Sequence, residues 1–168
     1  RNDYMGAMVD TRGVVTVKNS TFVENGDFGL LVDVPTAAAV SLENVQGAFN
    51  GEAGIRIGAS GAVTVRNAIN FLNDGSGMYI TNPWNGGLYP SAVSIYGSSF
   101  PVNDVNGLYI EARGNVLLSG IYSTSGNGGN GVLVNTCLWT GTACAGTGTV
   151  TLTSPGPNTS NFAYNSSY

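Results

Sequence analysis

The chain contains no histidine and few charged residues. Of its 168 residues, 10% are Asp, Glu, Lys or Arg, and the net charge is -4. The absence of histidine excludes Ser-His-Asp and Cys-His catalytic arrangements and removes the commonest protein metal ligand. The chain also lacks a basic cluster, which excludes nucleic-acid binding of the kind that sets Lys and Arg against phosphates.

Long apolar runs are absent and cysteine is scarce. No run of 18 apolar residues occurs, so we predict no membrane span. The two cysteines, Cys137 and Cys144, do not make a four-ligand zinc site without histidine. They flank an insertion, and we expect a disulfide between them that closes this loop in an oxidising compartment. Two free thiols in a reducing cell are the alternative.

Glycine is abundant, with 25 residues, and six of these glycines open a repeated phrase. Each is followed by an apolar, a variable and an apolar residue, a period-two pattern that predicts a short strand with one buried face. Successive phrases start 23 to 30 residues apart, the spacing of a solenoid with one supersecondary unit per repeat. The phrases are 6–9, 29–32, 54–57, 77–80, 107–110 and 131–134.

A second alternating phrase follows each first one and predicts a second strand in every repeat. Its copies are 15–17, 40–42, 63–65, 93–95, 116–118 and 150–152. An aromatic residue then recurs and suggests a third short strand. The aromatic set is Phe22, Phe49, Phe71, Phe100 and Tyr122.

Two sets of asparagines separate these predicted strands. Asn19, Asn44 and Asn67 follow the second strand and are replaced by Gly97 and Gly120 in later repeats, as expected for a corner with left-handed backbone angles. The other set precedes the next glycine phrase, and we expect its amides to form a hydrogen-bonded ladder along the solenoid. Its members are Asn25, Asn50, Asn73 and Asn103.

Repeats of about two dozen residues, with short strands and no helical periodicity, predict an all-β fold: a parallel β-helix of about six coils without a capping helix. The chain resembles the right-handed parallel β-helix repeat family, in particular the Gly- and Asn-rich repeat arrays of secreted or cell-surface bacterial proteins. The right-handed sense follows from this resemblance and from the preference of parallel crossovers. We expect residues 1–168 to be a single β-helix segment of a longer array, since 165–168 resembles 2–4, which precedes the first glycine phrase.

The resemblance implies a catalytic alternative, because enzymes with this fold cleave acidic polysaccharides by calcium-assisted elimination or between paired carboxylates. Asp10 and Asp33 occupy matching positions in consecutive coils and are the residues that would hold Ca²⁺ or form such a pair. A calcium site needs six to eight oxygen ligands. The position of Asp10 and Asp33 is occupied by Gly58 and Thr81 in the next two coils, so it supplies no further carboxylate there. We therefore expect neither a catalytic residue nor a cofactor.

The middle residue of each first strand points outward and predicts one exposed row. Five of its six members are large and apolar or aromatic, so the row is a candidate surface for glycans or for a neighbouring rod, unless loops cover it. Trp84 and Tyr89 lie in the insertion that follows Tyr79 and are candidates either for this surface or for its cover. The row is Met8, Leu31, Arg56, Tyr79, Tyr109 and Leu133.

We predict an extracellular or cell-surface structural or adhesive element. Its partners would be further coils of the same protein or end-to-end copies, since nothing in the sequence caps the core. A polysaccharide-active enzyme or carbohydrate-binding module is the alternative function. Three N-glycosylation sequons begin at Asn19, Asn158 and Asn165, although such patterns arise easily in a chain rich in Asn, Ser and Thr.

Overall fold

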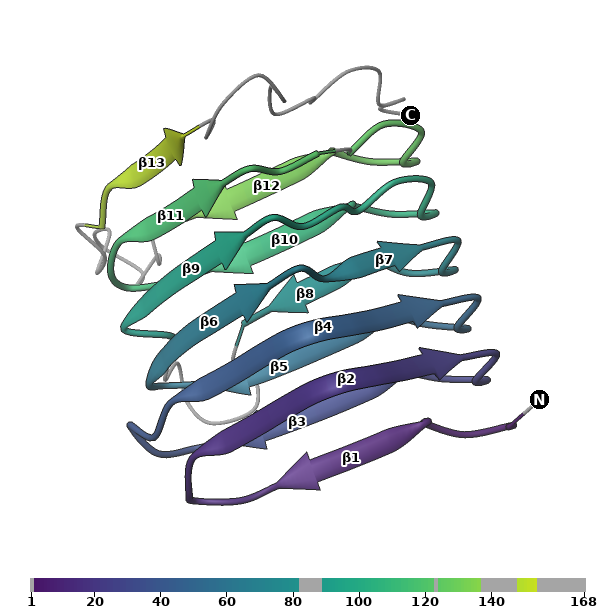
Figure 1. The fold of residues 1–168 in the computed structure, drawn as a ribbon, viewed down its shortest axis with the longest axis horizontal. Coiled ribbons are helices and arrows are strands. Elements are labelled where there is room, and N and C mark those ends of the chain that lie inside the picture. Colours follow the sequence, from purple (N-terminus) through teal and green to yellow (C-terminus); the bar gives the residue numbers. More distant parts are fainter. Residues whose placement is uncertain (1, 82–88, 123, 137–147, 154–168) are drawn as a thin grey trace, which may run out of the picture.

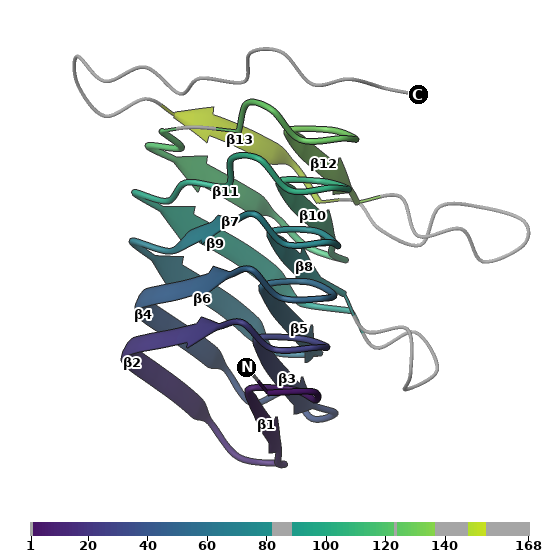
Figure 2. The ribbon, with the colours of Figure 1, turned by 90° about the vertical axis from the view of Figure 1, so that its right-hand side faces the viewer.

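The computed structural model describes residues 2–81, 89–122, 124–136 and 148–153. These residues form an all-β solenoid of two parallel sheets, and no helix occurs among them. Figure 1 shows the coils stacked along one axis, and Figure 2 shows the two sheets as opposite walls of the solenoid. The predicted parallel β-helix is confirmed, and its coil number roughly matches, since five turns separate the six strands of the first sheet.

The first sheet contains the six glycine phrases. Every neighbouring pair of strands is parallel, and the middle residues of the phrases are in register from the first coil to the last. In spatial order the strands are β1 (Ala7–Asp10), β3 (Leu30–Val34), β5 (Ile55–Ala59), β8 (Met78–Ile80), β10 (Leu108–Glu111) and β12 (Val132–Asn135).

The second sheet contains the second phrases in the predicted order and register. Its apolar residues face those of the first sheet and fill the interior, as period-two strands with one buried face require. The strands are β2 (Val15–Val23), β4 (Val40–Ala48), β6 (Ala62–Arg66), β9 (Ala92–Tyr96), β11 (Val116–Ser119) and β13 (Val150–Thr153), with the short β7 (Ile69–Phe71) paired to β4.

The third strand differs from the prediction. In the first two coils it is the continuation of β2 and β4 beyond the corner asparagines, and only β7 is a separate strand. The aromatic residues do not form one column either: Phe22 is in register with Gly47, which is in register with Asn70. A bulky ring in one coil therefore packs above a residue without a side chain in the next, because a narrow interior does not accommodate stacked rings at every level.

The predicted corner geometry is present. Asn19, Asn44 and Asn67 have φ of 50°, 53° and 53°, and Gly97 and Gly120 continue the corner with φ of 55° and 63°. The three side chains also form a short exposed ladder. Nδ2 of Asn44 donates to Oδ1 of Asn19 at 2.9 Å, and Nδ2 of Asn67 donates to Oδ1 of Asn44 at 3.0 Å. Asparagine therefore serves both the left-handed backbone and the cross-coil bond.

The second predicted ladder is buried and longer than expected. Asn25, Asn50 and Asn73 each donate from Nδ2 to Oδ1 of the asparagine in the next coil, at 2.8, 2.8 and 2.9 Å. Asn103 continues the series to Asn127, at 3.1 Å. Each acceptor oxygen also receives the backbone N–H of the preceding asparagine, so the ladder satisfies main-chain and side-chain groups together.

The glycine that opens each phrase packs against this ladder. A Cβ on Gly29 would lie 2.5 Å from the carbonyl oxygen of Gly54 and 2.8 Å from Nδ2 of Asn50. Gly6, Gly54, Gly77 and Gly107 meet the same two kinds of atom in their own coils. The repeated glycine is thus explained by the close approach of two coils and a buried amide.

We predict that Gly29→Ala lowers the free energy of unfolding by about 2–4 kcal/mol, because the added methyl group must displace backbone or a ladder amide. Gly13→Ala is the matched control, since the nearest atom to its Cβ would be Oγ1 of Thr11 at 3.7 Å. The control should change stability by less than about 0.5 kcal/mol. Urea unfolding followed by circular dichroism measures both variants, and equal effects would show that the glycine contacts do not constrain the coils.

Candidate functional site

The outward row of the first sheet is the principal candidate surface. Met8, at one end, is 57% exposed and Leu133, at the other end, is 37% exposed. The members between them, Leu31, Arg56, Tyr79 and Tyr109, are half-buried. The row therefore exists as predicted, with exposed ends and a partly covered centre.

Arg56, on β5, occupies the middle of the row and contacts two rings. Its guanidinium carbon lies 5.3 Å from the centroid of Phe28 and 5.7 Å from that of Tyr79. Phe28 precedes Gly29 in the preceding coil and lies outside the strands, so the strand pattern gave no signal for it. The cation is held between the two aromatic rings, and this arrangement restricts the guanidinium to one place on the surface.

Tyr79 and Tyr109 stack in neighbouring coils with ring centroids 4.8 Å apart and an interplanar angle of 31°. The hydroxyl of Tyr109 donates to Oε1 of Glu111 at 2.8 Å, and the hydroxyl of Thr81 donates to Oε2 at 2.5 Å. One oxygen of this carboxylate thus orients the Tyr109 ring, and the other accepts from Thr81. The rings form a rigid platform on β8 and β10.

Burial and the nearby carboxylate both affect the tyrosine hydroxyls. Desolvation raises the pKa of Tyr109, and its hydrogen bond to Glu111 raises it further. Desolvation and the charge of Glu111 also raise the pKa of Tyr79, while Arg56 lowers it. The half-buried Tyr89 also contributes to raising the pKa of both tyrosines. Both platform tyrosines therefore remain protonated donors at neutral pH.

Asp10 and Asp33 are in register on β1 and β3, as expected, and Gly58 follows them in β5. Among the described residues, no three His, Cys, Asp or Glu side chains gather to hold a metal ion. Desolvation raises the pKa of Asp33, the charge of Asp10 raises it further, and Arg56 lowers it. The Oδ1 atom of Asp33 is buried and has no hydrogen-bond partner.

Two hollows flank Arg56 on this face. One, of about 180 Å³, is lined by Met8, Leu31, Val32, Asp33, Arg56 and Gly58. The other, of about 250 Å³, is lined by Phe28, Glu52, Ala53, Arg56, Gly75, Ser76, Tyr79 and Val105. The structure therefore brings the aromatic row and one of the predicted acids into the same continuous surface.

The outer face of the second sheet provides a comparison. Lys18 and Glu43 form an ion pair at 2.8 Å, and the hydrogen bond from Lys18 lowers the pKa of Glu43. The guanidinium of Arg66 lies 4.2 Å from the ring centroid of Tyr96 in the next strand. Each of these charged groups thus has a partner on the same face.

The remaining predicted residues are placed as follows. Asn19 is exposed, and its Oδ1 accepts a hydrogen bond from Asn44 at 2.9 Å. Trp84, the proposed Cys137–Cys144 disulfide and the sequons at Asn158 and Asn165 lie outside the described residues. No helix in the described part of the chain is long and apolar enough to cross a membrane.

Comparisons with protein-family models, with curated proteins and with solved structures returned no match to this chain.

We predict that Asp33 titrates above its ordinary value of 3.8, because burial and Asp10 both disfavour its charged form. Asp10→Asn should lower the pKa of Asp33, whereas Arg56→Gln should raise it. A titration of the carboxylate carbon by nuclear magnetic resonance measures all three proteins. Shifts in the opposite directions would refute the assigned causes.

The same shift has a stability consequence. A folded-state pKa above the unfolded value means that Asp33 contributes stability below the unfolded pKa and that this contribution is lost as pH rises through the folded pKa. Asp33→Asn should therefore be more stabilising at pH 7 than at pH 3, relative to the unsubstituted chain.

Proposed function

We propose that this chain is an extracellular structural or adhesive β-solenoid element that continues or stacks end to end to form a fibre or stalk. The observation that carries the proposal is the state of the first coil. Val14 is 70% exposed, and the inward residues Val9 and Val17 are only half-buried, whereas the matching Val32 and Leu42 of the next coil are fully buried. Within the described residues, the core of the first coil is therefore only partly covered.

The strand edges of the first coil are open as well. Within the described residues, β1 pairs only with β3 and β2 only with β4. An unpaired edge presents a row of N–H and C=O groups to any strand of matching direction. Solenoids ordinarily cover such edges with a polar terminal repeat, and no such repeat lies beside the first coil in the part of the chain that the structure describes.

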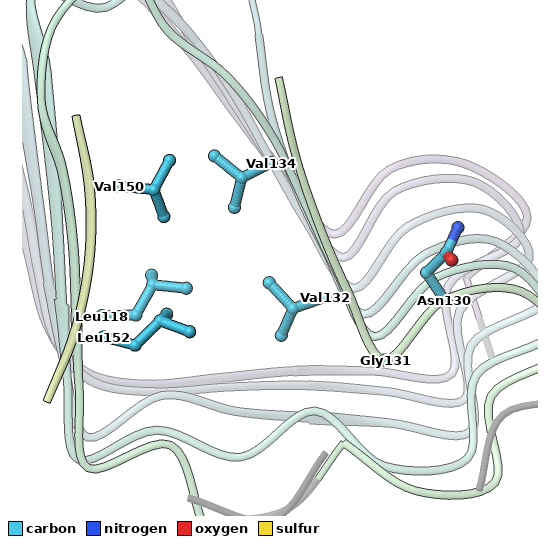
Figure 3. A pocket seen from close by; sticks show the side chains of 7 residues that line it. All are labelled: Leu118, Asn130, Gly131, Val132, Val134, Val150 and Leu152. Carbon is cyan, nitrogen blue, oxygen red and sulfur yellow. The ribbon is translucent and has the colours of Figure 1, made fainter. Parts of the chain in front are cut away.

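The last described coil has the complementary shape. Side chains from β12 face those of β11 and β13 across an open interior, as Figure 3 shows for Val132, Val134, Leu118, Val150 and Leu152. This hollow measures about 380 Å³ and is lined mainly by aliphatic groups. Leu152 is 58% exposed there, in contrast to the buried Leu118 in register with it.

All the strands of each sheet run parallel, so the open edges of the first coil match the strands of the last described coil of another copy in direction. Such a contact is heterologous, and repetition of a heterologous contact that does not close produces a filament. A further coil of the same polypeptide would pair with such an edge in the same way. The expected disulfide and the low surface charge support the extracellular setting.

The test is electron microscopy of the purified chain, with sedimentation velocity over a range of concentrations. We expect rods longer than one chain and a sedimentation coefficient that rises with concentration. A folded monomer at all concentrations would overturn the stacking contact.

We predict that Met8→Pro blocks stacking but leaves the fold intact. The amides of Ala7 and Thr11 donate to the carbonyl oxygens of Gly29 and Asp33 in the second coil. Amides of a parallel strand point alternately to its two sides, so the amide of Met8 points to the open edge. Proline there removes an edge donor and leaves the bonds to β3 unchanged. Met8→Ala, which keeps the amide, is the matched control and should still stack. Equal assembly by both variants would contradict pairing through the β1 edge.

A further inference from the structure

A third face of the solenoid lies between the exposed and the buried asparagine ladders. It is formed by β7 and by the parts of β2 and β4 beyond the corner asparagines, which lie one above another (Figure 1), and by the equivalent segments of the next two coils. Strand register sets one row of outward residues on this face, which we call the strand row. Its members are Thr21, Gln46, Ile69, Ser99 and Tyr122.

The turn row, on the same face, consists of the residues that immediately precede the buried ladder asparagines. Each has a left-handed backbone, with φ of 53° to 56° in the first four coils and 74° in the fifth. This conformation is unfavourable for large side chains, above all for the β-branched Val102. The fifth coil uses glycine there, so the turn itself requires no side chain. The row is Glu24, Phe49, Leu72, Val102 and Gly126.

The large apolar members of the two rows are exposed to solvent. Phe71, which lies between the rows, packs edge-on against Phe49 with ring centroids 5.6 Å apart and joins them into one patch. Exposed apolar side chains that are kept on an unfavourable backbone are typical of an interaction surface. The residues that are between 42% and 53% exposed are Phe49, Ile69, Leu72, Val102 and Tyr122.

The charges around the patch restrict its partner. Glu24 is the one charged residue of the two rows, and it lies at their end in the first coil. The turns that follow the buried ladder contain Asp27, Glu52, Asp74 and Asp104 but no Lys or Arg. This acidic rim opposes an anionic membrane or a nucleic acid. The patch itself is almost uncharged, so a second uncharged apolar surface covers it without burying charges.

The turn row is complementary to a second copy of itself. A two-fold axis parallel to the strands, at the level of the third coil, would set the first coil of one copy against the fifth of the other. Phe49 of one copy would then face Val102 of the other, so a large ring meets a smaller side chain. Glu24 would face Gly126, which has no side chain and no charge. Leu72 lies in the third coil and would meet its own copy.

The strand row shows the same complementarity about the same axis. Tyr122 of one copy would face Thr21 of the other, and Gln46 would likewise face the smaller Ser99. Ile69 lies in the third coil and would meet its own copy beside the two leucines. Large side chains therefore meet small ones away from the axis, and aliphatic side chains meet on it, which is the fit that a packed interface requires.

We propose that the third face pairs two copies of the chain side by side, with antiparallel solenoid axes and with Phe49, Ile69, Leu72 and Val102 at the centre of the contact. Five coils at about 4.8 Å each give a contact about 24 Å long, so a single pair is weak. The pair does not depend on the end-to-end contact proposed above. In a fibre the lateral contact would recur along the axis and become strong by repetition, a consequence that rests on that proposal.

Sedimentation equilibrium of the full chain carrying Met8→Pro tests the lateral contact by itself, because this substitution is expected to block end-to-end pairing. We expect a reversible monomer–dimer equilibrium at high protein concentration. Val102→Asn should weaken pairing at least tenfold, since each dimer contains two contacts between Val102 and Phe49. Val105→Asn is the matched control: Val105 is 46% exposed, against 47% for Val102, and lines the hollow beside Arg56 instead. It should leave the dissociation constant unchanged.

The stability of the same variants separates pairing from folding. Asparagine and glycine both adopt left-handed φ readily, and Gly126 already occupies the equivalent position in the next coil. Chains with Val102→Asn or Val102→Gly should therefore keep or gain stability to urea while their pairing weakens. A structural role for this valine would instead lower stability in both variants.

Chemical cross-linking tests the orientation of the pair. In a chain that carries Cys137→Ser and Cys144→Ser, Leu72→Cys should couple to itself through a short bismaleimide. A mixture of Phe49→Cys and Val102→Cys chains should couple more efficiently than either chain alone, because these two positions face each other only when the copies are antiparallel.

Three outcomes would overturn the lateral pair: a Met8→Pro chain that is monomeric at every concentration, equal effects of Val102→Asn and Val105→Asn on pairing, or no coupling of Leu72→Cys to itself. None of them bears on the end-to-end contact, which is judged on the chain without Met8→Pro. Failure of one contact is therefore distinguishable from failure of the other.

Discussion

The buried asparagine ladder is the interaction on which the rest of the structure depends. Asn25, Asn50, Asn73, Asn103 and Asn127 are almost fully buried, and each is linked to the next through its side-chain amide and its backbone. An amide at this depth is costly unless its donors and acceptors are paired, and the pairing is available only when successive coils are in one register. The ladder therefore selects the register, and a slip of one residue would leave several amides unpaired.

The ladder also determines which outward side chains of successive coils lie above one another. Coils held in one register place equivalent residues above one another, so a side chain that points outward in one repeat becomes part of a row. The stacking of Tyr79 on Tyr109 and of Arg66 on Tyr96 follows from this geometry. The same constraint leaves the first coil with open edges. The fibre-like assembly that we propose is thus a consequence of the repeated unit.

Most of the fold could be predicted from the sequence, because period-two strands and corner asparagines recur at a nearly constant spacing. The alignment of Met8 with Leu31 and of Asp10 with Asp33 follows from counting residues within a repeat. The same counting does not place the aromatic residues, which are not equivalent from coil to coil: Phe49 is 53% exposed while Phe100 is buried. Their register depends on how much volume each level of the interior holds, and that is a property of neighbouring coils together.

The site was less predictable for the same reason. The row of outward residues was visible, but the placement of Phe28 against Arg56 was not, because Phe28 lies in a turn whose path no periodic pattern specifies. The unsatisfied oxygen of Asp33 also required coordinates. Asn70 is a further example: it is fully buried with both amide atoms unpaired, and its Oδ1 fits against Gly47 and Gly54, where a Cβ would lie 2.6 and 3.0 Å away. Sequence alone gives no reason to expect a polar residue there.

Hydrogen exchange of the asparagine side-chain amides, measured residue by residue by nuclear magnetic resonance, tests the central claim most directly. The Nδ2 protons of Asn50 and Asn73 should exchange much more slowly than those of Asn44 and Asn67, because the former pair is buried and the latter exposed within an equally regular ladder. Slow exchange confined to the buried ladder would establish it as the stable element between coils. Equal and rapid exchange in both ladders would contradict the account.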